Sequence, residues 1–242
     1  MQQRLPSLLA RPVAFGHRGA KAHERENTLG SFALALRLGA TGLESDVWMT
    51  ADGVAVLDHD GIVRQGLRKK PIGELRRDQL PAHMPTLADL VEAQTGEWHL
   101  SLDLKDPSAG AEVVKVVAGL RPALLERLWL CHPSLDELTR LQADVVPGVR
   151  LVHSTRLKRL TTGPERHAAV LAERGVHAMN MHYTDWTGGL VTLFHRFDRL
   201  AMSWDLQFEP QLRDAVRMGC DAVFSDFVDR MMDVVTDELG AA

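Results

Sequence analysis

The amino-acid sequence predicts an α/β protein in which a single domain, residues 1–242, forms a closed (β/α)8 TIM barrel. Short apolar runs alternate with amphipathic segments along the chain, giving eight strand–helix pairs of about 30 residues each. The alternative is an open doubly wound sheet, which often carries a glycine-rich phosphate loop after its first strand. No GxGxxG motif is present, and the first strand ends in His17-Arg18-Gly19. The closed barrel is therefore the prediction.

Eight short apolar runs are predicted as the strands of the barrel, because each is flanked by segments of helical character. In chain order they are Val13–Gly19, Gly42–Thr50, Trp98–Lys105, Leu128–His132, Val149–Ser154, Ala178–Tyr183, Leu200–Asp205 and Ala222–Asp226.

The helices are predicted between these strands, where apolar residues recur at helical spacing. They are Leu29–Leu38, Leu87–Ala93, Glu112–Leu120, Leu135–Val145, His167–Arg174, Leu190–Phe197, Gln211–Met218 and Val228–Leu239. Thr86 is the expected N-cap of the second helix, with Asp89 three residues later. The segment Gly61–Pro85 has no such pattern and is predicted as one long loop.

Composition and charge narrow the class of protein. Hydrophobic residues make up 45% of the chain and charged residues 25%, as in an ordinary globular protein, which excludes collagen-like and disordered classes. The formal net charge of -4 leaves no basic surplus, so we expect no nucleic-acid partner. No apolar run approaches the roughly 20 residues of a membrane span, so we expect no stable membrane insertion.

The cysteines and the N-terminal residues bear on the cellular compartment. Cys131 and Cys220 are too few for a disulfide framework and too far apart for a zinc site, so both are predicted to be packed thiols. The first residues, MQQRLPSLLARPVAF, lack the apolar core and cleavage site of a signal peptide. A cytoplasmic location is the expectation.

Two carboxylates on the second predicted strand indicate a cation site. Glu44 and Asp46 are two residues apart, so their side chains point the same way, about 6.6 Å apart along the strand. Two carboxylates facing one interior repel each other unless a cation or proton lies between them, and a divalent metal is the natural solution. Salt bridges to lysine or arginine are the alternative.

The third strand repeats this spacing with residues of opposite charge. Asp103 and Lys105 lie in the stretch SLDLK, where the aspartate can add a third oxygen ligand. Lys105 then places an ammonium group beside the metal, where an anionic substrate would bind. A buried ion pair between these two residues is the alternative.

Two histidines are candidate proton donors and acceptors. His17 ends the first strand, beside Arg18. His59 follows an extended run, and the turn dipeptide Asp52-Gly53 predicts a hairpin that carries His59 back towards the barrel mouth. Imidazole exchanges protons near neutral pH. One histidine is weak evidence, but two of them near carboxylates and cations form a much stronger set.

At these residues the sequence resembles the glycerophosphodiester phosphodiesterase family. The resemblance lies in the stretches GHRGAKAHERENTLGSFALAL, GATGLESDVWMTADGVAVLDHDG and LSLDLKD, and in the tail MSWDLQFEPQLRDAVRMGCDAVFSD. The ordered set HRG, ENT, ExD, DG and HD is highly specific, and the resemblance runs from the first strand to the last. It implies a barrel of the PLC-like phosphodiesterase type that hydrolyses glycerophosphodiesters with a divalent metal, Mg²⁺ or Ca²⁺.

By position, the resemblance assigns expected roles to eight residues. It implies that His17 and His59 are the acid/base pair and that Glu44, Asp46 and Asp103 hold the metal. Arg18 matches the arginine that binds phosphate, Lys105 matches the lysine of the ExK strand, and Trp204 matches the family's closing tryptophan. The implied products are sn-glycerol 3-phosphate and an alcohol.

The sequence departs from the family pattern at several positions. Asp103 replaces the usual glutamate, which shortens the reach of this side chain by roughly 1.5 Å. The family's PENT reads Arg25-Glu26-Asn27-Thr28, and its closing TD-P-D reads Ser225-Asp226-Phe227-Val228-Asp229. The short segment Gly61–Pro85 implies that the family's insertion domain is reduced or absent. Glu26-Asn27-Thr28 is expected to cap the first helix.

Three other functions remain open. The first is a lysophospholipase D-like activity in the same barrel, which would need an apolar groove and a way to approach a membrane. The second is a non-catalytic binding protein, and the third is an unrelated barrel enzyme such as an isomerase. Polar residues near strand ends are candidates for the alcohol pocket: His132, His153, Asn180, His182 and Trp204. The basic residues Arg156, Lys158 and Arg159 are expected to form a solvated loop.

Overall fold

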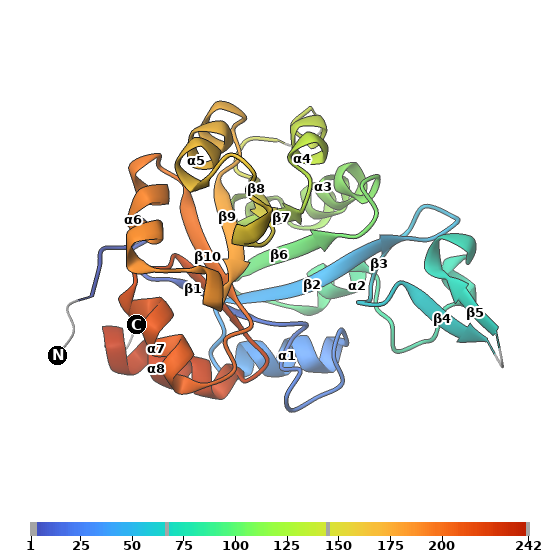
Figure 1. Ribbon diagram of the computed structural model, residues 1–242. Helices are drawn as coiled ribbons and strands as arrows, with labels where there is room; N and C mark the ends of the chain where they lie inside the picture. The colour runs from blue at the N-terminus through green and yellow to red at the C-terminus, as the bar shows by residue number, and fades with distance from the viewer. Residues whose placement is uncertain (1–3, 66–67, 144–145, 241–242) are drawn as a thin grey trace.

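A closed barrel of parallel strands forms the centre of the structure, a computed structural model that describes residues 4–65, 68–143 and 146–240 (Figure 1). The sheet has nine strands, and all but β3 run parallel to their neighbours. The parallel strands are β1 (Val13–Gly16), β2 (Gly42–Met49), β6 (His99–Leu104), β7 (Leu128–His132), β8 (Arg150–Ser154), β9 (Ala178–His182), β10 (Leu200–Trp204) and β11 (Ala222–Ser225). Strand β1 pairs with both β11 and β2, which closes the barrel as predicted.

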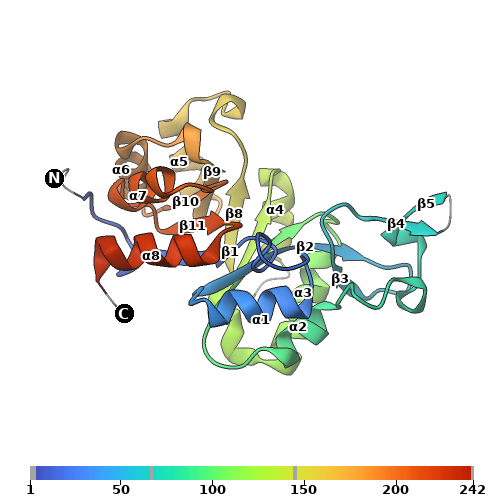
Figure 2. The same cartoon turned by 90° about the horizontal axis from the view of Figure 1, so that it is seen from below.

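Helices surround the barrel and alternate with its strands (Figure 2). They are α1 (Leu29–Arg37), α2 (Leu87–Ala93), α3 (Ala109–Leu120), α4 (Leu135–Leu141), α5 (Pro164–Glu173), α6 (Gly188–Arg196), α7 (Glu209–Arg217) and α8 (Val228–Leu239). Thr86 and Asp89 form the predicted capping box of α2. The predicted end of the fourth helix, Val145, lies outside the described residues. No helix in the described part of the chain is long and apolar enough to cross a membrane.

Two apolar layers hold this arrangement together. One packs the strands against the helices, and the other fills the barrel itself. Inside the barrel, Phe15 of β1 stacks on Phe224 of β11, with ring centroids 4.7 Å apart. Side chains on a strand alternate between its two faces, so residues two apart, such as Leu200 and Met202, both point into the barrel and join this apolar cluster. Polar side chains at the carboxyl ends of the strands therefore lie above a closed apolar floor.

A hairpin follows the second strand, as the Asp52-Gly53 turn predicts. Strand β3 (Ala55–Leu57) runs antiparallel to β2, and Gly53 has a φ of +77°, which glycine adopts without strain. This hairpin brings the chain back to the barrel mouth immediately before His59.

The segment after this hairpin is structured, and its prediction as an uninterrupted loop was wrong. It contains a second hairpin of β4 (Ile62–Gln65) and β5 (Arg68–Pro71), followed by two short 3-10 turns, Ile72–Glu74 and Arg77–Gln79. Figure 1 shows this hairpin projecting to one side of the barrel. A separate apolar cluster supports the segment: Val56, Val63, Ile72, Leu75, Leu80 and Met84. Their irregular spacing has neither a helical nor an alternating period, so no periodic pattern revealed them.

Candidate active site

A cavity of about 350 Å³ opens at the carboxyl ends of the barrel strands. All eight residues singled out from the sequence line it: His17, Arg18, Glu44, Asp46, His59, Asp103, Lys105 and Trp204. A larger cavity of about 580 Å³ lies on the outside of the barrel, beside α6 and α7, and contains none of these residues. The eight candidate functional residues therefore lie together at the mouth of the barrel.

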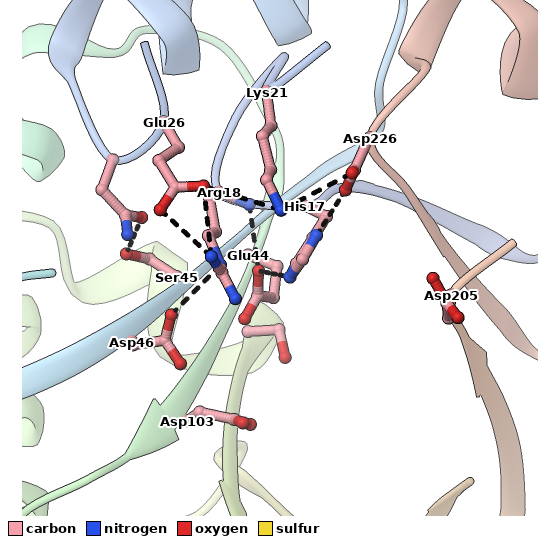
Figure 3. Close-up of polar contacts among 12 residues, drawn as sticks. His17, Arg18, Lys21, Glu26, Glu44, Ser45, Asp46, Asp103, Asp205 and Asp226 are labelled. Atoms are coloured by element: carbon pink, nitrogen blue, oxygen red, sulfur yellow. Dashed lines mark hydrogen bonds and ion pairs between the residues drawn. The ribbon is translucent and has the colours of Figure 1, made fainter. Parts of the chain in front are cut away.

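Three carboxylates meet in this cavity (Figure 3). Glu44 and Asp46 come from β2, and Asp103 comes from β6, where it lies opposite Asp46 in the strand register. One oxygen from each residue lies within 4.8 Å of the other two. Glu44 and Asp46 are almost fully buried, whereas about a third of the Asp103 side chain is exposed. The shorter side chain of Asp103 therefore still reaches the other two carboxylates.

Burial makes negative charge costly at this cluster. It raises the pKa of Glu44 to about 7, an effect that His17 opposes and that the charges of Asp46 and Asp103 reinforce. Burial also raises the pKa of Asp103, although the ammonium group of Lys105 acts in the opposite direction. A cation placed among the three oxygens would favour the ionised form of both groups.

The acidic cluster fits a hard divalent cation. Its donors are carboxylate oxygens, the ligands that Mg²⁺ and Ca²⁺ prefer, and separations below 4.8 Å suit oxygens bound to one ion. The Oδ2 atom of Asp46 is buried and accepts no hydrogen bond, although the Arg18 Nε atom lies 3.5 Å from it. Because a buried carboxylate oxygen seldom lacks a hydrogen bond, this atom is a suitable ligand position.

Lys105 forms an ion pair with Asp103, which the sequence left open as the alternative to metal ligation, and another with Asp46. Its Nζ atom lies 2.8 Å from Asp46 Oδ1 and 3.3 Å from Asp103 Oδ2. Burial lowers the pKa of Lys105, but the charges of Asp103 and Asp46 outweigh it, so the net pKa is above its ordinary value. The ion pair and the acidic cluster therefore coexist, with Lys105 fixed as a cation at the edge of the cluster.

Arg18 is held above the acidic cluster by Glu26, a residue expected to cap the first helix. The Nη1 atom of Arg18 donates hydrogen bonds to both carboxylate oxygens of Glu26 at 3.1 Å, and the Nε atom of Arg18 lies 3.5 Å from Asp46 Oδ2. The backbone N–H of Arg18 donates to Glu44 Oε2 at 3.0 Å. Arg18 thus connects to the acidic cluster through both its backbone and its side chain.

The expected capping role of Glu26-Asn27-Thr28 is correct only for Thr28, whose hydroxyl accepts a hydrogen bond from the backbone N–H of Ser31. Asn27 instead accepts a hydrogen bond from the buried hydroxyl of Ser45 on β2, at 2.7 Å. The ENT stretch therefore supports the cavity wall as well as the helix.

His17 is oriented by a partner that the sequence analysis did not single out. Its Nδ1 atom lies 2.5 Å from Asp226 Oδ1, and its Nε2 atom lies 3.8 Å from Glu44 Oε2 (Figure 3). Burial lowers the pKa of His17, but the charge of Glu44 and the hydrogen bond with Asp226 outweigh it, so the pKa is raised. The only sequence signal for Asp226 was its place in the closing Ser225-Asp226 motif.

His59 lies in the same cavity as His17, at the end of the β2–β3 excursion. Its Nδ1 atom is 2.8 Å from Asp60 Oδ1, and about two-fifths of its side chain is exposed. Asp58 accepts a hydrogen bond from the backbone N–H of Gly61 at 2.9 Å and so fixes the turn around His59. Two imidazoles therefore line the same cavity as the acidic cluster.

The remaining wall contains only some of the residues expected in an alcohol pocket. Asn180 and Trp204 line the cavity, together with Asp205, which the sequence analysis did not select. His153 instead forms a buried hydrogen bond with His167 at 2.9 Å, and His132 accepts one from the backbone of Ser134 at 3.0 Å.

The structure also corrects the expected positions of His182 and Arg156. The His182 ring packs against the Trp204 ring in a T-shaped arrangement, with centroids 4.6 Å apart, and is not among the residues that line the cavity. Arg156, expected in a solvated loop, makes an ion pair with Asp185 at 2.5 Å. Both residues therefore lie next to Trp204, which lines the cavity.

Known proteins with similar sequences point to the same family as the motifs described above. The sequence model described as "Glycerophosphoryl diester phosphodiesterase family" matches residues 17–230. A glycerophosphodiester phosphodiesterase from Bacillus altitudinis is 23% identical over 245 residues, covering 91% of this chain and 96% of that protein.

Solved structures show the same fold. A glycerophosphodiester phosphodiesterase from Thermotoga maritima superposes with a TM-score of 0.79 at 20% identity, covering 93% of this chain and 99% of the other. A phosphodiesterase from Oleispira antarctica, in complex with the product sn-glycerol-3-phosphate, has a TM-score of 0.77 at 20% identity, covering 93% and 97%.

Proposed function

The chain belongs to the glycerophosphoryl diester phosphodiesterase family, and on that premise we propose that it hydrolyses glycerophosphodiesters to sn-glycerol 3-phosphate and an alcohol. One observation carries the proposal: two imidazoles, two fixed cations and three clustered carboxylates line the same cavity of about 350 Å³. A purely binding site has no need of two groups that exchange protons beside an acidic cluster. We also propose that the enzyme is cytoplasmic, in keeping with its two free buried cysteines.

In the proposed reaction, Glu44, Asp46 and Asp103 hold a divalent cation, Mg²⁺ or Ca²⁺. When bound, such an ion polarises a phosphoryl oxygen and lowers the pKa of an attacking hydroxyl. The three residues bind it through carboxylate oxygens that already lie within 4.8 Å of one another.

Arg18 and Lys105 orient the phosphate and stabilise its charge. Arginine can offer two parallel hydrogen bonds to a phosphate, and the contacts with Glu26 keep the guanidinium in place. Lys105 adds a second positive charge on the side of Asp103. Both cations therefore lie along one side of the cavity, where the phosphate would bind beside the acidic cluster.

His17 and His59 exchange the protons of the reaction, one as base for the attacking hydroxyl and the other as acid for the leaving oxygen. Asp226 supports His17 by accepting the hydrogen bond from Nδ1–H, which leaves Nε2 directed towards Glu44. Asp60 makes the corresponding contact with His59.

The proposal is tested by incubating the purified protein with Mg²⁺ or Ca²⁺ and glycerophosphodiesters, and measuring sn-glycerol 3-phosphate with a coupled dehydrogenase. We expect turnover that EDTA abolishes and added metal restores. Lysophosphatidylcholine is assayed in parallel. Faster turnover of this lysophospholipid than of every glycerophosphodiester, or full activity in EDTA, would contradict the proposal.

A further inference from the structure

The wall of the cavity that faces the acidic cluster has its own polar groups. It is formed by Ser154 of β8, Asn180 of β9, and Trp204 with Asp205 at the end of β10. Figure 3 shows the Asp205 carboxylate on the other side of the opening from Glu44, Asp46 and Asp103. The proposed reaction gives Asp205 no role, although it lines the same cavity.

Asp205 is held in a fixed orientation at the end of its strand. It has a φ of +67°, in the left-handed region, where aspartate, asparagine and histidine are the commonest residues other than glycine. Its Oδ2 atom lies 3.0 Å from His182 Nε2, and its Oδ1 atom accepts a hydrogen bond from Gln207 Nε2 at 3.2 Å. Its side chain is nevertheless 46% exposed. The carboxylate is therefore both oriented and accessible.

The partners of the Asp205 carboxylate are an imidazole and an amide, and they include no lysine or arginine among the described residues. His182 Nδ1 lies 2.7 Å from the Thr184 hydroxyl oxygen and 3.3 Å from the Thr184 backbone nitrogen, and its Nε2 atom faces Asp205. In the described part of the chain, no lysine or arginine forms an ion pair with Asp205. Arg156, whose guanidinium lies 5.9 Å from the Trp204 ring centroid, is already paired with Asp185.

Trp204 and Asn180 add two further contacts for a ligand. Trp204 packs on the apolar floor of the barrel and presents its remaining ring surface to the cavity. Asn180 is buried, with only 6% of its surface exposed. Its side-chain amide donates a hydrogen bond to Ser154 Oγ at 3.3 Å, and its Oδ1 atom has no hydrogen-bond partner. Serine hydroxyls donate or accept, so either orientation of the amide leaves one of its polar atoms unpaired.

We propose that Asp205, with Trp204 and Asn180, forms a subsite that selects diesters whose alcohol carries an ammonium group. An anionic carboxylate beside an aromatic ring is a favourable environment for an ammonium ion. The inference rests on the proposed function and names the substrate class more closely. Glycerol is neutral and the phosphate is anionic, so only the esterified alcohol can supply the positive charge. The two sides of the cavity, Arg18 and Lys105 on one and Asp205 on the other, then match a zwitterionic diester.

The test compares kcat/KM for cationic and neutral diesters in matched variants. Glycerophosphoethanolamine and glycerophosphocholine are the cationic substrates, and glycerophosphoglycerol is the neutral one. We expect the native enzyme to prefer the cationic pair, and Asp205→Asn to lower the cationic-to-neutral ratio about fivefold. Raising the ionic strength should lower the ratio of the native enzyme towards that of the variant, because salt screens an exposed charge.

Asp198→Asn is the control, because it removes the same charge at another exposed aspartate with a positive φ, 55°, that does not line the cavity. It should leave the ratio unchanged. An equal ratio in the native enzyme and Asp205→Asn, with all three diesters hydrolysed, overturns the subsite and leaves the proposed function intact. Absence of turnover on every diester overturns the proposed function, and the subsite with it.

Discussion

His17 Nδ1 lies 2.5 Å from Asp226 Oδ1, although 209 residues separate the two along the chain. Closure of the barrel creates this contact, because β1 and β11 are neighbours and Gly16 pairs in register with Ser225. Each of the two residues directly follows its strand, so the same register that closes the barrel also sets the histidine against its partner. A carboxylate in this position fixes the tautomer and the orientation of the ring.

Replacing Asp226 by asparagine should lower kcat by at least about tenfold with little change in KM, because the partner of His17 Nδ1 is altered while the phosphate contacts remain. The neighbouring pair of His23 and Asp229, 3.1 Å apart, offers a matched control that does not line the cavity. Asp229→Asn should keep near-normal kinetics. Equal kinetics in Asp226→Asn and Asp229→Asn would show that Asp226 does not position His17.

Replacing either His17 or His59 by alanine should lower kcat by about 10²-fold or more, since each variant lacks one proton-transfer group. His23→Ala is the control, because His23 lies in the loop that follows β1 but does not line the cavity. Steady-state rates with a saturating diester provide the measurement. Near-native rates in His17→Ala or His59→Ala would remove that histidine from the mechanism.

Affinity for the metal should weaken in acid. Without a cation, burial raises the pKa of Glu44 to about 7, so a proton competes with the metal below that pH. The apparent Kd for Mn²⁺ or Ca²⁺ should therefore rise by about tenfold for each pH unit below the pKa and level off above it. Titration calorimetry between pH 8 and pH 6 measures this. A constant Kd across that range, or unchanged affinity in Glu44→Gln, would argue against ligation by Glu44.

Asp221 should contribute to stability rather than to catalysis. It is fully buried and accepts hydrogen bonds from Ser7, the backbone N–H of Ala201, and His195. Burial raises its pKa, but the hydrogen bonds from His195 and Ala201 outweigh it, so the folded-state pKa lies below its ordinary value.

That depressed pKa means that the stabilisation by Asp221 is fully present above the unfolded-state pKa and is lost as pH falls through the folded-state value. Asp221→Ala should lower the free energy of unfolding by about 3 kcal/mol at pH 7, with a smaller effect near pH 3. Urea unfolding at both pH values checks this. An equal loss at the two pH values would contradict the assignment.

The barrel and its acidic cluster were predictable because both depend on local patterns. Apolar runs separated by amphipathic segments marked all eight parallel strands, and the i, i+2 spacing placed Glu44 and Asp46 on one face. Asp226 and Glu26 were not recognised, because their roles depend on contacts with His17 and Arg18 that form only when the chain folds. Asp205 ended a predicted strand and could have been selected on that ground, but its contacts with His182 and Gln207 form only in the folded chain.

The central claim is that the carboxylates of Glu44, Asp46 and Asp103 bind one divalent cation beside His17 and His59. A crystal structure with Mn²⁺, located by its anomalous scattering, tests this most directly. We predict a single ion at about 2.0–2.5 Å from an oxygen of each of the three carboxylates. An ion bound elsewhere in the barrel, or Lys105 still paired with Asp46 and Asp103 at saturating Mn²⁺ with no ion among the three carboxylates, would contradict the account.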